Sequence, residues 1–219
     1  MTANQAVIDA ICGSFAGNDY PGDTFLQGSF DGCEPYEETA PFRGRTQWAD
    51  VEPEFLDTHA GALSFFSEAG FRFFLPAYLV ADLRDRLRVA DPLFHLTHGF
   101  VDTAVTVPIH GRTFTVKSGG SAFVNPRRFG AATFHDYARY RLAVFTREEA
   151  AAIVAYLQCK RALDGDGLGH ARIDAALDAY WLERARSAPT AASLRQHLAE
   201  QSDYLAAVRG GSPAGGNEP

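Results

Sequence analysis

The sequence predicts a mainly α-helical protein of the α+β class: a single-domain helical bundle around a central phenylalanine-rich helix, with one β-hairpin insertion. Three observations predict this class. Apolar residues recur at helical spacing through most of the chain, a phenylalanine-rich run lies before its midpoint, and alternation of β-branched residues is confined to residues 103–117. A chain of 219 residues with 46% hydrophobic side chains is expected to form one globular domain, which we place at residues 1–208.

The central helix is predicted to begin in the most apolar stretch of the chain, residues 64–83, and to continue to Leu87. Ser67 and Glu68 suit a helix start, because a serine hydroxyl accepts from open backbone donors and an acidic residue is favourable in the first turn. Pro76 lacks a backbone donor, so the helix is expected to kink there or to begin there. The buried stripe is expected to comprise large apolar residues at helical spacing: Phe71, Phe74, Leu75, Tyr78, Leu79, Leu83 and Leu87.

The segment before this helix is predicted to contain a helix at residues 5–15, a turn at residues 18–23 and an acidic loop. Two interpretations of the turn and loop stay open: a metal or proton-transfer site, or a hydrated loop whose charges keep it soluble. The second is favoured, because hard cations need several oxygens at fixed positions and soft ions need more than one thiolate. The potential ligands are Asp19, Asp23, Asp31, Cys33, Glu34, Glu37 and Glu38.

Another helix is predicted at residues 53–66. His59 would lie on or near its apolar face, where a lone histidine is more often a hydrogen-bonded core residue than a ligand. Trp48, which precedes this helix, is interpreted in the same way, as a packing anchor whose indole N–H finds a carbonyl. Both residues are therefore expected in the core, with a ligand-binding role as the alternative.

Residues 91–98 are predicted to form a short helix, because Asp91 and Pro92 suit a helix start. His95 and His98 are three residues apart and could share one face of it. Metal binding by this pair is not favoured, because neither a neighbouring glutamate nor an obvious third ligand accompanies the two imidazoles.

The second half of the chain combines the hairpin with further helices. Runs of β-branched residues around His110-Gly111 predict a β-hairpin at residues 103–117. Thr146 and Glu149 have the spacing of a capping box for the helix that follows. Residues 164–169 are interpreted as a glycine-rich helix stop, since a calcium loop there would lack an oxygen ligand and its closing glutamate. Further segments are expected at residues 173–188 and 190–208, both helical, and at 209–219, a disordered tail.

Charge and cysteine usage narrow the classes of function. The net charge of -7 disfavours nonspecific nucleic-acid binding, which needs an excess of Lys and Arg, but allows attraction of a basic protein partner. Three cysteines without metal-knuckle or redox-pair spacing fit a reduced setting. The sequence shows no signal peptide and no apolar run of about 18 residues. We expect a soluble, cytoplasmic protein without membrane contact, and the sequence predicts no cofactor and no metal.

Several short motifs carry a wider resemblance: Tyr20-Pro21-Gly22-Asp23, Cys33-Glu34, Trp48, His59 with Ala62-Leu63-Ser64-Phe65, Phe71-Arg72-Phe73-Phe74-Leu75-Pro76-Ala77-Tyr78-Leu79, Phe145-Thr146 and Tyr180-Trp181. In this order and spacing they resemble a family of small soluble bacterial proteins described as a domain of unknown function. The resemblance covers about residues 5–183 and is most specific at Leu75-Pro76-Ala77-Tyr78-Leu79. It implies no catalytic residue. The hairpin at 103–117 and the helix at 190–208 look like additions to the shared pattern.

Two functional hypotheses from different classes follow. The preferred one is a protein-interaction module, an immunity-type or regulatory partner of a basic protein, because acidity is combined with an aromatic core and with no complete catalytic constellation. The alternative is a metal-assisted or small-molecule enzyme that uses the acidic N-terminal loop. Candidate ligand or partner residues are Asp19, Tyr20, Asp23, Cys33, Glu34, Trp48, His59 and Tyr78.

Overall fold

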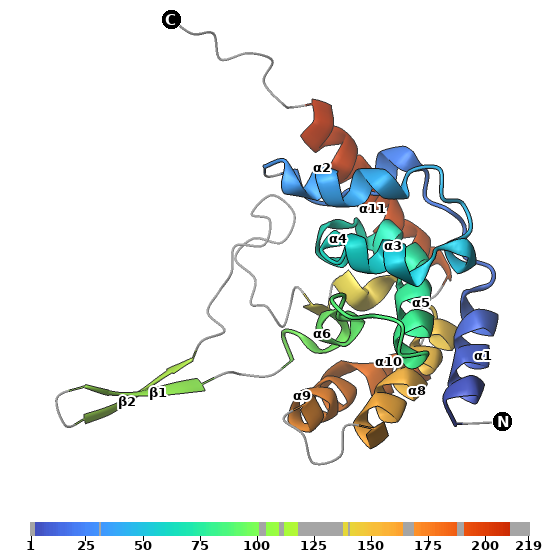
Figure 1. Ribbon diagram of the computed structural model, residues 1–219. Helices are drawn as coiled ribbons and strands as arrows, with labels where there is room; N and C mark the ends of the chain where they lie inside the picture. The colour runs from blue at the N-terminus through green and yellow to red at the C-terminus, as the bar shows by residue number, and fades with distance from the viewer. Residues whose placement is uncertain are drawn as a thin grey trace, which may run out of the picture.

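The computed structural model describes residues 3–30, 32–100, 104–109, 112–117, 138–139, 141–163, 169–187 and 191–210. Helices dominate these residues and gather around α5 (Glu68–Leu83), which lies near the middle of the helical body in Figure 1. The prediction of a mainly α-helical protein is therefore confirmed.

The other described helices form one group before α5 in the sequence and one group after it, and the two longest, α8 and α11, belong to the second group. The first group is α1 (Ala3–Phe15), α2 (Glu34–Thr39), α3 (Pro53–Thr58) and α4 (Ala62–Phe65). The second group is α6 (Pro92–Thr97), α8 (Arg147–Leu163), α9 (Gly169–Ala176), α10 (Leu182–Arg186) and α11 (Ala191–Gly210). Single 3-10 turns are η1 (Asp23–Phe25), η2 (Ala40–Phe42), η3 (Trp48–Asp50) and η4 (Leu142–Val144), and η5 (Leu177–Trp181) is a π-helical turn.

Two strands, β1 (Ala104–Ile109) and β2 (Arg112–Lys117), pair in antiparallel register, with Ala104 opposite Lys117. Their connection at 110–111 lies outside the described residues, as does 164–168, where a helix stop was expected. The tail was predicted to begin at residue 209, but α11 continues to Gly210, and 211–219 lie outside the described residues. The status of the strand pair as an insertion, the extra character of the last helix and the single-domain boundaries stay predictions.

Helix α5 is buried over most of its length. Its first turn is capped by Ser67, whose hydroxyl accepts from the Gly70 N–H at 2.9 Å, as the sequence predicted. Pro76 lies inside the helix, so the helix does not begin there. On the far side of the first turn, the buried Gln201 of α11 accepts from the Ala69 N–H at 3.1 Å. Two side chains therefore satisfy donors that an isolated helix would leave open.

The predicted apolar stripe was wrong at its end, because α5 stops at Leu83 rather than continuing to Leu87. Asp85 adopts a left-handed conformation with φ of 54°, which ends the helical path. The chain then turns onto α3, where the Asp57 carboxylate accepts three successive backbone N–H groups, from Arg88, Val89 and Ala90.

The single helix predicted at residues 53–66 was also wrong, because the structure divides it into α3 and α4. His59 ends α3 with a non-helical backbone, and the Ala62 N–H donates to the His59 carbonyl across the turn. Gly61 lies in this turn against Glu38, and a Cβ there would approach the Glu38 side chain to 3.2 Å. The break therefore lies against α2, a tertiary contact that periodicity does not report.

The Asp57 carboxylate makes the free energy of unfolding depend on pH, because it accepts three backbone N–H groups. Burial alone would raise the pKa of Asp57, but its three N–H donors hold the pKa below the usual range. A depressed folded pKa stabilises the protein above the unfolded value of about 3.9, and this contribution disappears as the pH falls through the folded pKa. Asp57→Asn is therefore expected to destabilise the protein at pH 7 by about 1–3 kcal/mol and to flatten the acid limb of its stability curve.

Thermal melts of Asp57→Asn between pH 7 and strong acid would measure this contribution. The control is Asp203→Asn, because Asp203 is an exposed carboxylate of α11 with no capping role. If the melting temperatures of the wild-type protein and Asp57→Asn fall equally steeply as the pH is lowered, the expectation is wrong.

Candidate functional site

A pocket of about 230 Å³ lies between α4, α6 and the segment that contains η4. Three stretches of chain that are far apart in the sequence form its wall. Three of the seven lining residues are apolar, three carry nitrogen in their side chains and one carries a hydroxyl. The lining residues are Ser64, Phe94, His95, His98, Ala138, Arg141 and Leu142.

Helix α6 positions the two histidines of the pocket. Asp91 caps the helix, since its carboxylate accepts from the Phe94 N–H at 2.9 Å. The His95 ring lies edge-on to Phe94, with ring centroids 5.3 Å apart. The His98 ring stacks on Phe94 at 4.6 Å with an interplanar angle of 26°. Phe94, which is 38% exposed, therefore holds both imidazoles against its own ring.

Burial and positive charge keep the imidazoles of the pocket neutral. The pKa of His95 falls to about 3, first because burial disfavours its charged form and then because Arg141 and His98 lie nearby. Burial, followed by the charge of Arg172, lowers the pKa of His98 as well. A neutral imidazole offers one N–H donor and one acceptor nitrogen, so at neutral pH His95 can bind a ligand through either nitrogen.

Arg141 brings the permanent charge of the pocket. Its guanidinium lies 4.5 Å above the Phe71 ring, and Nη2 donates to the Leu63 carbonyl. Among the described residues, no carboxylate forms an ion pair with this guanidinium. Its side chain is therefore held by a ring and a carbonyl, and no carboxylate in the described part of the chain compensates its charge.

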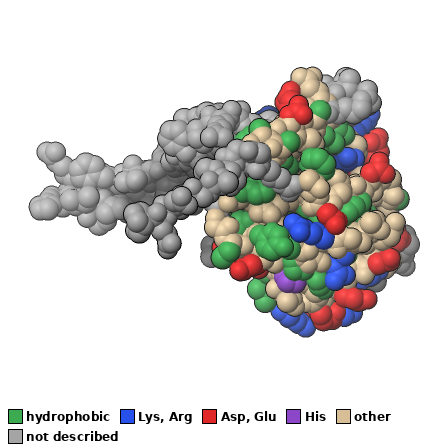
Figure 2. Space-filling model, turned by 90° about the horizontal axis from the view of Figure 1, so that it is seen from above, with side chains coloured by type: hydrophobic (Ala, Val, Ile, Leu, Met, Phe, Trp, Pro, Cys, Tyr) green, Lys and Arg blue, Asp and Glu red, His purple; other side chains and the backbone are tan. Residues whose placement is uncertain are grey.

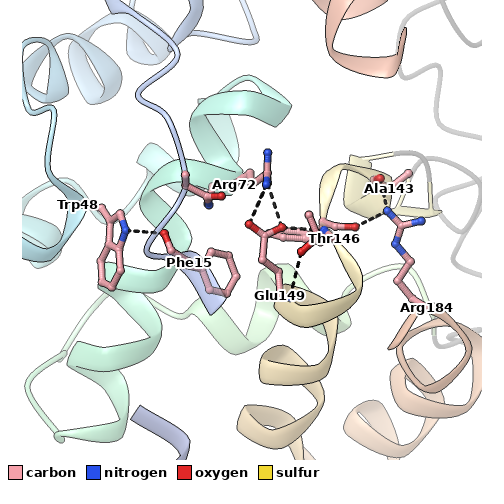
Figure 3. Close-up of polar contacts among 9 residues, drawn as sticks. Phe15, Trp48, Arg72, Ala143, Thr146, Glu149 and Arg184 are labelled. Atoms are coloured by element: carbon pink, nitrogen blue, oxygen red, sulfur yellow. Dashed lines mark hydrogen bonds and ion pairs between the residues drawn. The ribbon is translucent and has the colours of Figure 1, made fainter. Parts of the chain in front are cut away.

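Two neighbouring arginines follow the same pattern. The Arg139 guanidinium donates to the Ala179 carbonyl at 2.8 Å and lies over the Tyr180 ring. Arg184 donates to the carbonyls of Ala143 and Phe145 (Figure 3), and burial lowers its pKa. Within the described residues, main-chain oxygens rather than carboxylates thus accept from the guanidinium groups of Arg139, Arg141 and Arg184 around η4.

The residues predicted as a site from the N-terminal turn and loop mostly face water. Asp19, Asp23, Cys33 and Glu34 are exposed. In the described ranges, no three His, Cys, Asp or Glu side chains come close enough together to hold a metal ion. The shared metal or proton-transfer site at this loop stays a prediction, and these placements do not support it.

One pair within that predicted set does meet. The Tyr20 hydroxyl donates to the Asp23 carboxylate, and the Gly44 N–H donates to both of them, at 3.1 and 2.9 Å. Burial and the Asp23 carboxylate raise the pKa of Tyr20 to about 12, whereas the hydroxyl and the Gly44 N–H lower the pKa of Asp23. The pair fastens the turn to the segment after η2, and the Tyr20 ring packs edge-on to Phe73.

The remaining predicted site residues belong to the core. The Trp48 indole N–H donates to the Phe15 carbonyl at 3.3 Å (Figure 3), which confirms the packing-anchor interpretation. Tyr78 is fully buried, its pKa is raised by burial, and its hydroxyl donates to the His59 carbonyl at 3.3 Å. The His59 ring itself packs edge-on to Phe42 and Phe55.

Sequence reasoning noted the spacing of His95 and His98 but missed the other pocket residues. Ser64 lies inside an apolar run, and Phe94 is one aromatic residue among many. Arg141 lies more than 40 residues beyond the histidines, and no spacing rule connects them. The only local signal was the pair of imidazoles on a short, well-capped helix.

Comparisons with known proteins place part of this chain. No curated protein and no solved structure is detectably similar to it. The resemblance to an uncharacterised family is confirmed over a shorter range than expected, because the matched range ends at residue 104 and not near 183. This range contains Ser64, Phe94 and both pocket histidines but not Arg141. Over residues 5–104 the chain matches DUF6714, described as a family of unknown function.

Proposed function

We propose that this protein binds a small molecule in the pocket between α4, α6 and η4. The observation that carries the proposal is the convergence of His95, His98 and Arg141 on one hollow whose other walls are mainly apolar. Small-molecule sites typically combine apolar walls with a few well-placed polar groups. Here each polar group is also held in place, the two imidazoles by Phe94 and the guanidinium by Phe71 and a carbonyl.

The proposal does not depend on a catalytic step. Ser64 and His95, which the structure both describes, form no hydrogen bond with each other, so the pair itself gives no support for an activated hydroxyl. Binding is therefore the activity that the arrangement supports.

Ser64→Phe is expected to abolish ligand binding without unfolding the protein. Ser64 is exposed on α4 and faces the pocket, so a phenyl ring there fills the hollow at little cost to packing. The measurement is ligand-observed NMR with a panel of neutral and charged single-ring fragments. We expect several fragments to bind the wild-type protein and none to bind Ser64→Phe.

The matched control is Gln158→Phe, which places the same ring on an exposed position of α8 that does not line the pocket. This variant should keep the wild-type set of fragments. Fragments that bind Ser64→Phe as well as the wild-type protein, or a panel with no binder at all, would refute the proposal.

The interaction module predicted from the sequence stays a second proposal. It is supported by the net charge of -7, since long-range attraction would speed capture of a basic protein. Acidic and basic side chains are interspersed on the face seen in Figure 2, so complementarity would come from overall charge rather than from one acidic patch there. If affinity capture from lysate at low salt recovers no basic protein, this proposal fails.

None of the described helices has both the length and the apolar character needed to cross a bilayer.

A further inference from the structure

We infer that the ligand of the His95–His98–Arg141 pocket is a small, single-ring carboxylate, with its ring against Phe94 and Leu142 and its carboxylate on Arg141. The inference rests on the proposed function and adds the chemical class of the ligand.

The positive charge of Arg141 favours an anionic ligand in the pocket. A half-buried guanidinium costs free energy of desolvation, which a carboxylate partner would offset. Other arginines of this protein have such partners: Arg72 pairs with Glu149 at 2.9 Å and Arg161 with Asp174 at 3.0 Å. Arg141 has only a carbonyl and a ring among the described residues, although it lines a pocket. The ligand is therefore expected to bring the missing negative charge.

Donors for both carboxylate oxygens are available. The Arg141 Nη2 atom donates one N–H to the Leu63 carbonyl. Its second N–H, together with an N–H of Nε or Nη1, can still bind both oxygens of one carboxylate side by side. The His95 ring makes no hydrogen bond to any described residue, and its neutral form keeps an N–H donor. Arg141 and His95 together provide a charged donor and a neutral one for a single acidic group.

The pocket size restricts the rest of the ligand. An apolar cavity of about 150 Å³ holds benzene, so about 230 Å³ accommodates one ring with a small substituent. The apolar part of the lining consists of Leu142, Ala138 and the partly exposed Phe94 ring. An aromatic ring fits this surface through offset or edge contacts.

A comparison of benzoate with benzamide, which has nearly the same shape but no charge, tests this ligand class. Isothermal titration at pH 7 is expected to give benzoate an affinity about tenfold or more above that of benzamide, since a charge-assisted contact outweighs a neutral one by this amount. Arg141→Gln should remove this difference by weakening benzoate about tenfold while benzamide changes by less than about threefold. Retained benzamide binding also shows that the variant is folded around an intact pocket.

The control variant is Arg86→Gln, which removes an exposed arginine that pairs with Glu54 away from the pocket and should leave both affinities unchanged. Equal binding of benzoate and benzamide to the wild-type protein would overturn the ligand class and leave the small-molecule proposal standing. Failure of both probes would overturn the ligand class too. The fragment panel then decides whether the proposed function also fails, because its neutral members do not require Arg141.

Discussion

Glu149→Ala is expected to lower the free energy of unfolding by about 3–5 kcal/mol, the cost of removing one partner from a buried ion pair. The Glu149 carboxylate belongs to a residue that is only 1% exposed. It accepts from Nε and Nη2 of Arg72, at 3.0 and 2.9 Å, and from the Thr146 N–H at 2.7 Å (Figure 3). One side chain thus fastens α8 to α5 and closes the capping box at the start of α8.

The loss is large because two groups lose their partner together. Arg72 has a side chain that is 20% exposed, so water can solvate its guanidinium only in part once the carboxylate is gone. The Thr146 N–H becomes an open donor at the start of α8, which adds about 1 kcal/mol. In a chain of this length a loss of this size corresponds to a fall in melting temperature on the order of 10 °C.

Glu148→Ala is the matched control, because Glu148 lies in the same first turn of α8 but is exposed. It should change the free energy of unfolding by less than about 0.5 kcal/mol. Chemical denaturation measures the free energy of unfolding of both variants. A double-mutant cycle of Arg72→Ala, Glu149→Ala and the variant with both changes would give the coupling between the two charges. If Glu149→Ala loses no more stability than Glu148→Ala, the ion pair contributes nothing and the expectation is wrong.

The parts of this fold that could be predicted depend on residues close in sequence. The Ser67 cap of α5 and the Thr146–Glu149 box of α8 each involve groups within one helical turn, and both lie where the sequence placed them. The mainly helical class follows from the same kind of local periodicity.

The parts that could not be predicted depend on contacts between distant segments. The break between α3 and α4 involves Glu38 on α2, and α5 ends where Asp57 binds the N–H groups of the following turn. The pocket needs Arg141 beside His95, a contact that only the folded chain creates. Carboxylates near one another in the sequence, such as Asp19 and Glu34, gave a stronger local signal than any pocket residue, yet they are exposed to solvent.

Phe74→Ala is expected to destabilise the protein by about 3–5 kcal/mol, the usual cost of deleting a buried phenylalanine ring. Phe74 has no exposed surface and lies at the centre of an aromatic cluster. Its ring stacks on Phe66 at 5.2 Å and meets Phe42 and Phe73 edge-on at 4.9 and 4.8 Å. The cluster joins η2, α5 and the segment after α4, so the cavity left by alanine cannot close without moving several elements.

Tyr36→Ala is the control, because it deletes an aromatic ring outside the core. Tyr36 is 52% exposed and contacts Arg43 at the surface. It should cost less than about 1 kcal/mol. A double-mutant cycle between Phe42 and Phe74 should give a coupling of about 0.5–1.5 kcal/mol, the range for edge-on aromatic pairs beyond simple burial. Additive effects of these two deletions would mean that each ring contributes apolar area alone. A measurable coupling would mean that the edge-on geometry itself stabilises the arrangement, which would explain why this chain uses phenylalanine rather than leucine at this point of its core.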